Sequence, residues 1–176
     1  LLKGKHNLSN FIASATAAKL LNVKNKKIKK TMELFTGIKH RLQFVKNIGG
    51  SSYFNDSKAT NISSVIAAIN SFNAPIILLL GGKNKDSDFR LLLPHTKRHV
   101  KHIVSFGEAG GEIATAIGDA VRLDIKSSLN QAVASAHKIA SPGDIILMSP
   151  GCASFDEFKN FEDRGEKFIK MVNELK

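Results

Sequence analysis

The stretch Ile76-Ile77-Leu78-Leu79-Leu80-Gly81-Gly82 decides the fold class of this 176-residue chain. Five consecutive apolar residues are typical of a short strand that is buried on both faces of a parallel sheet. The two glycines end the run and indicate a tight turn. On both sides of this stretch, short apolar runs alternate with segments of helical periodicity.

The same patterns predict the remaining elements. Strands are expected at residues 42–48, 52–55, 76–80, 102–106, 121–123 and 144–148, and the first two form a hairpin around Gly49-Gly50. Helices are expected at 61–72, 89–99, 111–117, 129–139 and 155–175, the last with a break near Gly165 left open. Strands separated by helices predict an α/β fold with a doubly wound, mostly parallel sheet of about six strands.

Two further helices are expected before this sheet, at residues 7–22 and 28–35. Their apolar faces have no sheet of their own to cover, so they resemble the end of a domain whose body lies elsewhere. The chain also opens on Leu1 rather than Met. We therefore expect it to be a piece of a longer protein.

The formal net charge of +11 is concentrated before Arg41, where the sequence has nine lysines and one acidic residue, Glu33. A nucleic-acid or membrane patch is one interpretation. A solvated lysine surface is favoured, because no aromatic or arginine side chains interleave with these lysines as base-reading surfaces require. The longest apolar run, 75–80, is far too short to span a bilayer. We expect neither nucleic acid nor a membrane as a partner.

The single cysteine, Cys152, excludes an internal disulfide and fits a reducing cytosol, so a cytoplasmic location is expected. A catalytic thiol is the alternative to a small packing residue. Packing is favoured because no His lies near Cys152 in the sequence. His6 and His40 have no second ligand at metal-binding spacing, and no metal site is expected.

The carboxyl ends of parallel strands meet at one edge of such a sheet, where ligands bind. The stretch 55–61 follows one strand and contains Asp56, suited to a ribose hydroxyl or a metal, Lys58, suited to an anion, and the hydroxyl of Thr60. A capped helix start explains this stretch equally well.

Two other strand ends carry anion-binding candidates. Lys85 follows the Gly81-Gly82 turn and can reach an anion, although this segment by itself favours a simple strand-to-helix turn. Ser154 is expected to cap the last helix, where backbone N–H groups bind a carboxylate. The P-loop pattern GxxxxGK[ST] is absent from the chain. The glycine-rich stretch 107–111 is interpreted as structural.

Four stretches, read in order, resemble the Mur ligase family, and within it the D-glutamate-adding member. They are Gly4-Lys5-His6-Asn7 with Asn10, His40-Arg41, Asn55-Asp56-Ser57-Lys58-Ala59-Thr60-Asn61, and the long stretch Ser149–Gly165. The last is distinctive, and the resemblance covers essentially the whole chain.

The resemblance implies a three-domain enzyme: a UDP-binding domain, a central ATPase domain with a P-loop, and a Rossmann-like C-terminal domain. Residues 1–39 would be the last helices of the central domain, and residues 40–176 the C-terminal domain. The implied reaction is ATP-dependent addition of D-glutamate to UDP-N-acetylmuramoyl-L-alanine through an acyl phosphate. Mg²⁺ would be bound mainly by the central domain, and this chain alone would be inactive.

The resemblance also implies roles for individual residues. Asn7, Asn10, His40, Arg41 and Asp56 match nucleotide-binding positions, with Asp56 on the ribose and Arg41 on the phosphates. Thr60, Lys85, Ser154, Phe155 and Phe161 match D-glutamate-binding positions, and Lys58 matches a catalytic position. Lys83-Asn84 departs from the family pattern before Lys85. A free-standing nucleotide or amino-acid binding module and a basic nucleic-acid-binding domain remain the alternatives.

Overall fold

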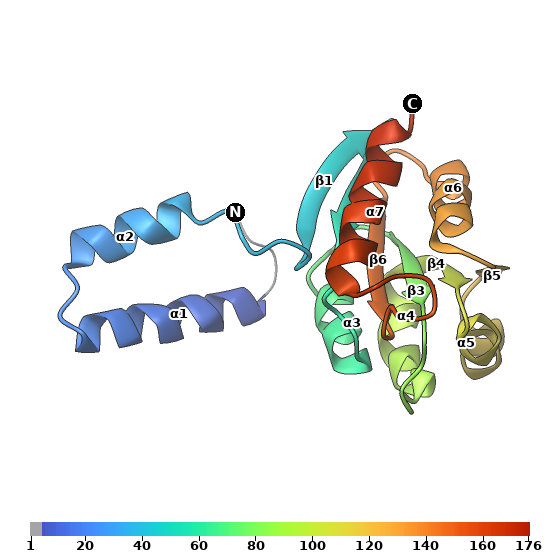
Figure 1. Cartoon of the computed structure of the whole chain (residues 1–176), viewed down its shortest axis with the longest axis horizontal. Coiled ribbons are helices and arrows are strands. Elements are labelled where there is room, and N and C mark those ends of the chain that lie inside the picture. The colour runs from blue at the N-terminus through green and yellow to red at the C-terminus, as the bar shows by residue number, and fades with distance from the viewer. Residues whose placement is uncertain (1–4) are drawn as a thin grey trace.

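The computed structural model describes residues 5–176, in which a six-stranded sheet forms the centre of the larger part (Figure 1). The strands are β1 (Gln43–Ile48), β2 (Ser51–Asn55), β3 (Ile76–Gly81), β4 (Val100–Phe106), β5 (Leu123–Lys126) and β6 (Ile145–Gly151). Their order across the sheet is β1-β2-β6-β3-β4-β5. The β1–β2 hairpin is antiparallel and every other neighbouring pair is parallel. The predicted α/β fold with a mostly parallel sheet is confirmed.

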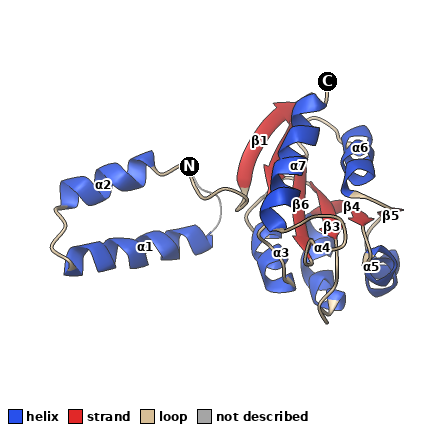
Figure 2. Ribbon diagram, in the orientation of Figure 1, coloured by secondary structure: helices blue, strands red, loops and turns tan. Residues whose placement is uncertain are grey.

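Helices cover both faces of this sheet (Figure 2). On one face lie α3 (Ile62–Ile69), α4 (Leu93–His99) and α5 (Gly110–Ile117), together with the short 3-10 helix η1 (Phe89–Leu92). On the other face lie α6 (Leu129–Ile139) and α7 (Phe161–Glu174). The short 3-10 helix η2 (Gly118–Ala120) leads into β5 at the edge.

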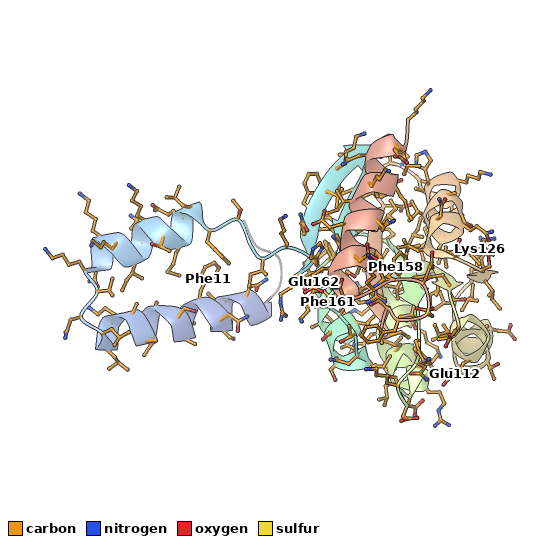
Figure 3. All side chains as sticks on the ribbon, in the orientation of Figure 1. Phe11, Glu112, Lys126, Phe158, Phe161 and Glu162 are labelled. Atoms are coloured by element: carbon orange, nitrogen blue, oxygen red, sulfur yellow. The ribbon has the colours of Figure 1, made fainter. Side chains whose placement is uncertain are left out.

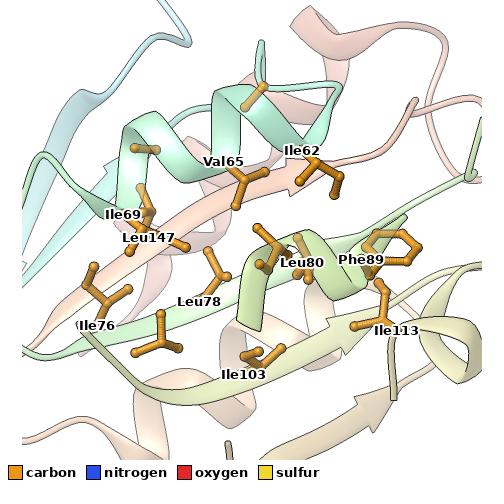
Figure 4. Close-up of a cluster of buried hydrophobic side chains, with 14 of the residues drawn as sticks. Ile62, Val65, Ile69, Ile76, Leu78, Leu80, Phe89, Ile103, Ile113 and Leu147 are labelled. Carbon is orange, nitrogen blue, oxygen red and sulfur yellow. The ribbon is translucent and has the colours of Figure 1, made fainter. Parts of the chain in front are cut away.

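The strand predicted from the apolar run is β3, in the middle of the sheet. Ile76, Leu78 and Leu80 pack under α3, η1 and α5 (Figure 4), whereas Ile77 and Leu79 belong to the cluster on the α6–α7 face. All five side chains are fully buried, which explains why this strand shows no polar alternation.

The Gly81-Gly82 turn is confirmed, and glycine is required there. Gly81 has φ +151°, and a Cβ at this position would overlap the backbone carbonyl of Phe106. Gly82 has φ +121° and would place a Cβ against the carbonyl of Ala153. The backbone of this turn therefore lies directly against the loops after β4 and β6.

The helices α1 (Lys5–Leu20) and α2 (Asn25–Leu34) form a pair that stands apart from the sheet (Figure 1). Phe11 points from α1 toward α2 (Figure 3), and its ring meets that of Phe35 edge-on at 6.0 Å. No side chain of α2 is buried, and Leu8, Ile12, Leu20, Leu21 and Leu34 are exposed. The expected helices are confirmed, with α2 beginning three residues earlier than expected.

Several other expected boundaries are wrong: α3 ends at Ile69 rather than at residue 72, and β6 ends at Gly151 rather than at residue 148. The strand expected at 121–123 is β5 at Leu123–Lys126. The last helix begins at Phe161 rather than at residue 155, because the side chain of Asn160 caps it by accepting the N–H of Asp163 at 2.7 Å. The helix is not broken at Gly165, which is an interior residue of α7.

Candidate active site

The loops that follow β2, β6, β3 and β4 meet at one edge of the sheet, because these four strands are neighbours and run in the same direction. They include the sequence stretches that were singled out for ligand binding.

Arg164 of α7 forms hydrogen bonds with two of these loops, the one that follows β2 and the one that follows β6. Its side chain is fully buried, and its acceptors are all uncharged. Nε donates to Ser57 Oγ and Nη2 to Ser57 O, both at 3.0 Å, while Nη1 and Nη2 each donate to Cys152 O at 3.1 Å. Nη1 also donates to Ala153 O at 3.3 Å. Burial lowers the pKa of Arg164 to about 10, so the guanidinium remains charged at neutral pH.

The loops after β3 and β6 are joined by their backbones. The N–H of Lys83 donates to Ala153 O at 2.9 Å, and the N–H of Ala153 donates to Lys83 O at 3.0 Å. Just beyond this bridge, Lys85 Nζ lies 5.4 Å from the ring centroid of Phe155, and both side chains are exposed. Two residues predicted for the same ligand are therefore neighbours.

Ser154 does not start a helix, so that prediction is wrong. Its side chain is buried, and its carbonyl accepts the N–H groups of Glu157 and Phe158 at 3.3 and 2.8 Å, which forms a turn. Because the helix begins seven residues later, no helix dipole acts at Ser154.

Asp56 is buried at the end of β2. Its Oδ2 accepts the hydroxyl of Ser149 at 2.8 Å, and Oδ1 accepts the N–H of Leu42 at 3.1 Å. Burial raises the pKa of the Asp56 carboxyl to about 6. The two hydrogen bonds and the nearby Arg41 favour the charged form and oppose this rise, but burial has the larger effect.

A cleft of about 960 Å³ lies between the α1–α2 pair and the sheet domain. It is large enough for a nucleotide-sized ligand. Its lining includes Asn7, Asn10, Arg41, Asp56 and Lys58, from α1, the segment between α2 and β1, and the loop after β2. Five residues singled out in the sequence are thus brought together from separate segments.

The other predicted residues do not line this cleft. Lys85, Ser154 and Phe155 lie on the loops after β3 and β6. Thr60 is exposed at the end of the loop after β2, directly before Asn61, which caps α3. Of the residues predicted for the nucleotide, the cleft holds Asn7, Asn10, Arg41 and Asp56 but not His40, and it also holds Lys58. Of those predicted for D-glutamate, Lys85, Ser154 and Phe155 form a separate loop group, to which Thr60 and Phe161 do not belong.

His40 is the main departure in the nucleotide set, because its side chain is buried rather than presented to the cleft. Its backbone N–H donates to Gln43 Oε1 at 2.9 Å, and its Nδ1 lies 3.0 Å from Asn55 Nδ2. A Cβ at Gly165 would overlap the His40 ring. Burial lowers the pKa of His40, so the neutral imidazole is favoured.

Phe161 contacts residues of the loop after β2 and the buried His40. Its ring centroid lies 3.8 Å from Lys58 Nζ, and its edge contact with the His40 ring spans 6.3 Å. Its carbonyl also accepts the hydroxyl of Ser57 at 2.7 Å. Figure 3 places Phe161 at the start of α7, on the side nearest the α1–α2 pair.

Arg164 and Ser149 are site residues that the sequence did not predict. Arg164 could have been found from helical periodicity, because it falls on the face of α7 that carries Phe161, Phe168 and Val172, where a charged residue is unexpected. Ser149 offers no such signal, since a serine at a strand end is common. Cys152 is buried, and burial raises its pKa to about 12, which confirms the packing role.

Among the described residues, no three His, Cys, Asp or Glu side chains gather where they could hold a metal ion. Within the same part of the chain, no helix is both long and apolar enough to cross a membrane.

A sequence profile described as "Mur ligase, glutamate ligase domain" matches residues 40–152. The chain belongs to the Mur ligase family. It is 43% identical over 99% of its length to the UDP-N-acetylmuramoylalanine–D-glutamate ligase of Bacillus cytotoxicus, and it covers 39% of that protein. The ligase of the same name from a Geobacillus species is 44% identical over 100% of this chain, which covers 40% of it. The chain therefore spans about two fifths of the length of these relatives.

Solved structures share the fold at low sequence identity. MurF from Acinetobacter baumannii matches with a TM-score of 0.71 and 19% identity, over 95% of this chain and 38% of that one. Mycobacterium tuberculosis folylpolyglutamate synthase complexed with ADP matches with a TM-score of 0.72 and 14% identity, over 97% and 41%. These matches extend through the α1–α2 pair as well as the sheet.

Proposed function

We propose that this chain is part of an ATP-dependent ligase that adds D-glutamate to UDP-N-acetylmuramoyl-L-alanine in the synthesis of peptidoglycan precursors. The observation that carries the proposal is the 43% identity, over 99% of the chain, to a ligase named for D-glutamate. Because the reaction consumes ATP, we place it in the cytoplasm.

The proposed reaction has two steps. The alanine carboxylate takes the γ-phosphoryl group of ATP, which releases ADP and leaves an acyl phosphate. The amine of D-glutamate then attacks the carbonyl carbon, and the tetrahedral intermediate expels phosphate as the nitrogen loses a proton. Lys58, which lines the cleft, would stabilise the negative charge that develops on the reacting group.

The cleft supports the nucleotide side of this division. Asn7, Asn10 and Arg41 would contact the nucleotide, with Arg41 on the phosphates and Asp56 on the ribose. Asp56 can still accept hydrogen bonds from ribose hydroxyls, because each carboxylate oxygen has a second lone pair. His40 would act indirectly, since its side chain is buried and does not line the cleft.

The loop group supports the D-glutamate side. Lys85 is exposed and would pair with one of the two carboxylates of D-glutamate. Ser154 and Phe155 would line the same site. The hydroxyl of Thr60, on the loop after β2, would donate a hydrogen bond to D-glutamate. The described residues do not fit a Mg²⁺ site, so we assign the metal that such ligases require to another part of the enzyme and derive no step through it.

We also propose the domain division at residues 39 and 40, with α1 and α2 belonging to a central ATPase domain. The support is the exposed apolar surface of these helices and their separation from the sheet (Figure 1). In the isolated chain, the amides of α1 and α2 should exchange with solvent much faster than those of β3. Equal protection of α1 and β3 in a monomer would contradict the division.

The experiment for the function uses the full-length protein that contains this chain. With ATP, Mg²⁺ and UDP-N-acetylmuramoyl-L-alanine, phosphate release should depend on D-glutamate and should be accompanied by the amide product. The 176-residue chain alone should form neither acyl phosphate nor product, because it has no P-loop. A full-length protein that binds ligands without turnover would favour the alternative, a free-standing binding module.

A further inference from the structure

The backbone N–H and the side-chain ammonium of Lys58 each make a contact, and neither contact involves a carboxylate. Its backbone N–H donates to His40 O at 3.0 Å, and its Nζ lies over the ring of Phe161, 3.8 Å from the centroid. Among the side chains that the structure describes, no carboxylate lies within ion-pair distance of Nζ. The aromatic face is therefore its main electrostatic partner.

Contacts to both the backbone and the ring of Phe161 hold it in place. It is the first residue of α7, directly after the capping residue Asn160. Its carbonyl accepts the hydroxyl of Ser57, the neighbour of Lys58, and its ring meets the buried His40 ring at an interplanar angle of 81°. A ring fixed in this way can fix the ammonium above it.

Lys58 lines the cleft, whereas Phe161 does not. The family resemblance assigned Phe161 to D-glutamate, but the geometry points to a different task. We propose that Phe161 is a positioning residue that acts through Lys58: its ring sets the place of the Lys58 ammonium in the cleft without forming an ion pair that would neutralise it. This gives Phe161 a role within the proposed ligase function.

The contact can be tested in the chain as it is, without any catalytic activity. In a lysine-labelled sample, the ε-methylene protons of Lys58, identified by their loss in Lys58→Gln, should resonate upfield of those of other exposed lysines because of the ring current of Phe161. Phe161→Leu should abolish this displacement and Phe161→Tyr should keep it. A Lys58 signal that does not move in Phe161→Leu would overturn the proposal.

Phe155 offers a matched control. Its ring is 61% exposed and lies 5.4 Å from Lys85 Nζ. Phe155→Leu should move the Lys85 signal and leave that of Lys58 in place. If Phe155→Leu moves the Lys58 signal as much as Phe161→Leu does, the effect is not the local ring contact and the proposal fails.

Kinetics of the full-length protein separate positioning from ligand contact. Phe161→Leu should lower kcat about two- to thirtyfold, the range expected from a cation–π contact, with a smaller change in the KM for D-glutamate. Phe161→Tyr should restore kcat, and Phe161→Leu should add little in a Lys58→Gln background. A raised KM with unchanged kcat would show that Phe161 touches D-glutamate itself and would overturn the proposal. Absence of all ligase activity in the wild type would refute the proposed function, while the Lys58 spectrum would still decide this inference.

Discussion

Arg164 donates to the backbone carbonyl of Cys152 from both terminal nitrogens of its guanidinium, each at 3.1 Å. The same side chain also bonds Ser57 through two further hydrogen bonds. The loop that follows β2 and the loop that follows β6 therefore share one buried cation, and their spacing at the edge of the sheet depends on it.

Replacing Arg164 should destabilise the fold. Arg164→Met removes a donor from three backbone carbonyls and leaves those of Ser57 and Cys152 unpaired, because Ala153 O keeps the N–H of Lys83. Each unpaired acceptor costs about 1–3 kcal/mol. Arg164→Lys should rescue only part of the loss, because one ammonium cannot reproduce the planar fork. Thermal unfolding should show a fall of several degrees for Arg164→Met. Arg98→Met, at an exposed position on α4, should leave the melting temperature nearly unchanged. Equal effects of the two methionine variants would contradict the bridging role.

Two helical glycines should respond to alanine with opposite signs. A Cβ at Gly165 would overlap the His40 ring, so Gly165→Ala should destabilise the chain by about 1–3 kcal/mol. A Cβ at Gly111 of α5 meets nothing within 4 Å, so Gly111→Ala should stabilise it by about 0.5–1 kcal/mol. Urea unfolding of both variants decides the matter. A neutral or stabilising Gly165→Ala would mean that His40 does not occupy this position.

The buried carboxyl of Asp56 should make stability depend on pH. Its folded pKa of about 6 lies above the ordinary value of 3.8, so between these pH values the folded state keeps a proton that the unfolded state has lost. Stability from this group is therefore greatest below about pH 4 and falls as the pH rises to about 6, by up to about 3 kcal/mol. Asp56→Asn should gain stability relative to the wild type across this window. Urea unfolding at pH 4, 5, 6 and 7 measures the difference, and parallel curves would refute it.

Lys85 should affect D-glutamate more than ATP. In the full-length protein, Lys85→Ala removes a charge-assisted hydrogen bond of about 1.5–3 kcal/mol, which corresponds to a rise of roughly ten- to a hundredfold in the KM for D-glutamate. Lys83→Ala is the matched control, because Lys83 pairs with Glu108 at 3.9 Å and should change this KM little. Asp56→Ala should show the reverse selectivity and raise the KM for ATP more. A Lys85→Ala variant with raised KM for ATP alone would assign the Gly81–Lys85 loop to the phosphates.

The sequence predicted the sheet because its signal is local. The buried run of β3 and the turn glycines can be recognised within ten residues, and strand ends of a parallel sheet converge by geometry alone. The end of the chain was harder. The sequence predicts that this helix starts at residue 155 with Ser154 as its cap, but it starts at Phe161, after the cap Asn160. Two competing caps cannot be ranked without the tertiary contacts that hold the segment before Phe161 in a turn.

The sequence could not show how site residues are supported. His40 reads as half of a polar pair in a linker, yet it is buried because Gly165 of α7, far away in the sequence, leaves room for its ring. Lys58 reads as a solvated charge, yet Phe161 lies beneath it. Such pairings depend on where α7 crosses the sheet, which periodicity does not specify.

The most direct test of the central claim transfers this chain into a relative. Its residues would replace the matching two fifths of the Bacillus cytotoxicus D-glutamate ligase, and phosphate release would be measured with ATP, UDP-N-acetylmuramoyl-L-alanine and either D-glutamate or another amino acid. We expect the chimaera to release phosphate with D-glutamate, and introducing Lys85→Ala into it to raise the KM for D-glutamate. A folded chimaera that is saturated by another amino acid while D-glutamate has no effect would contradict the account.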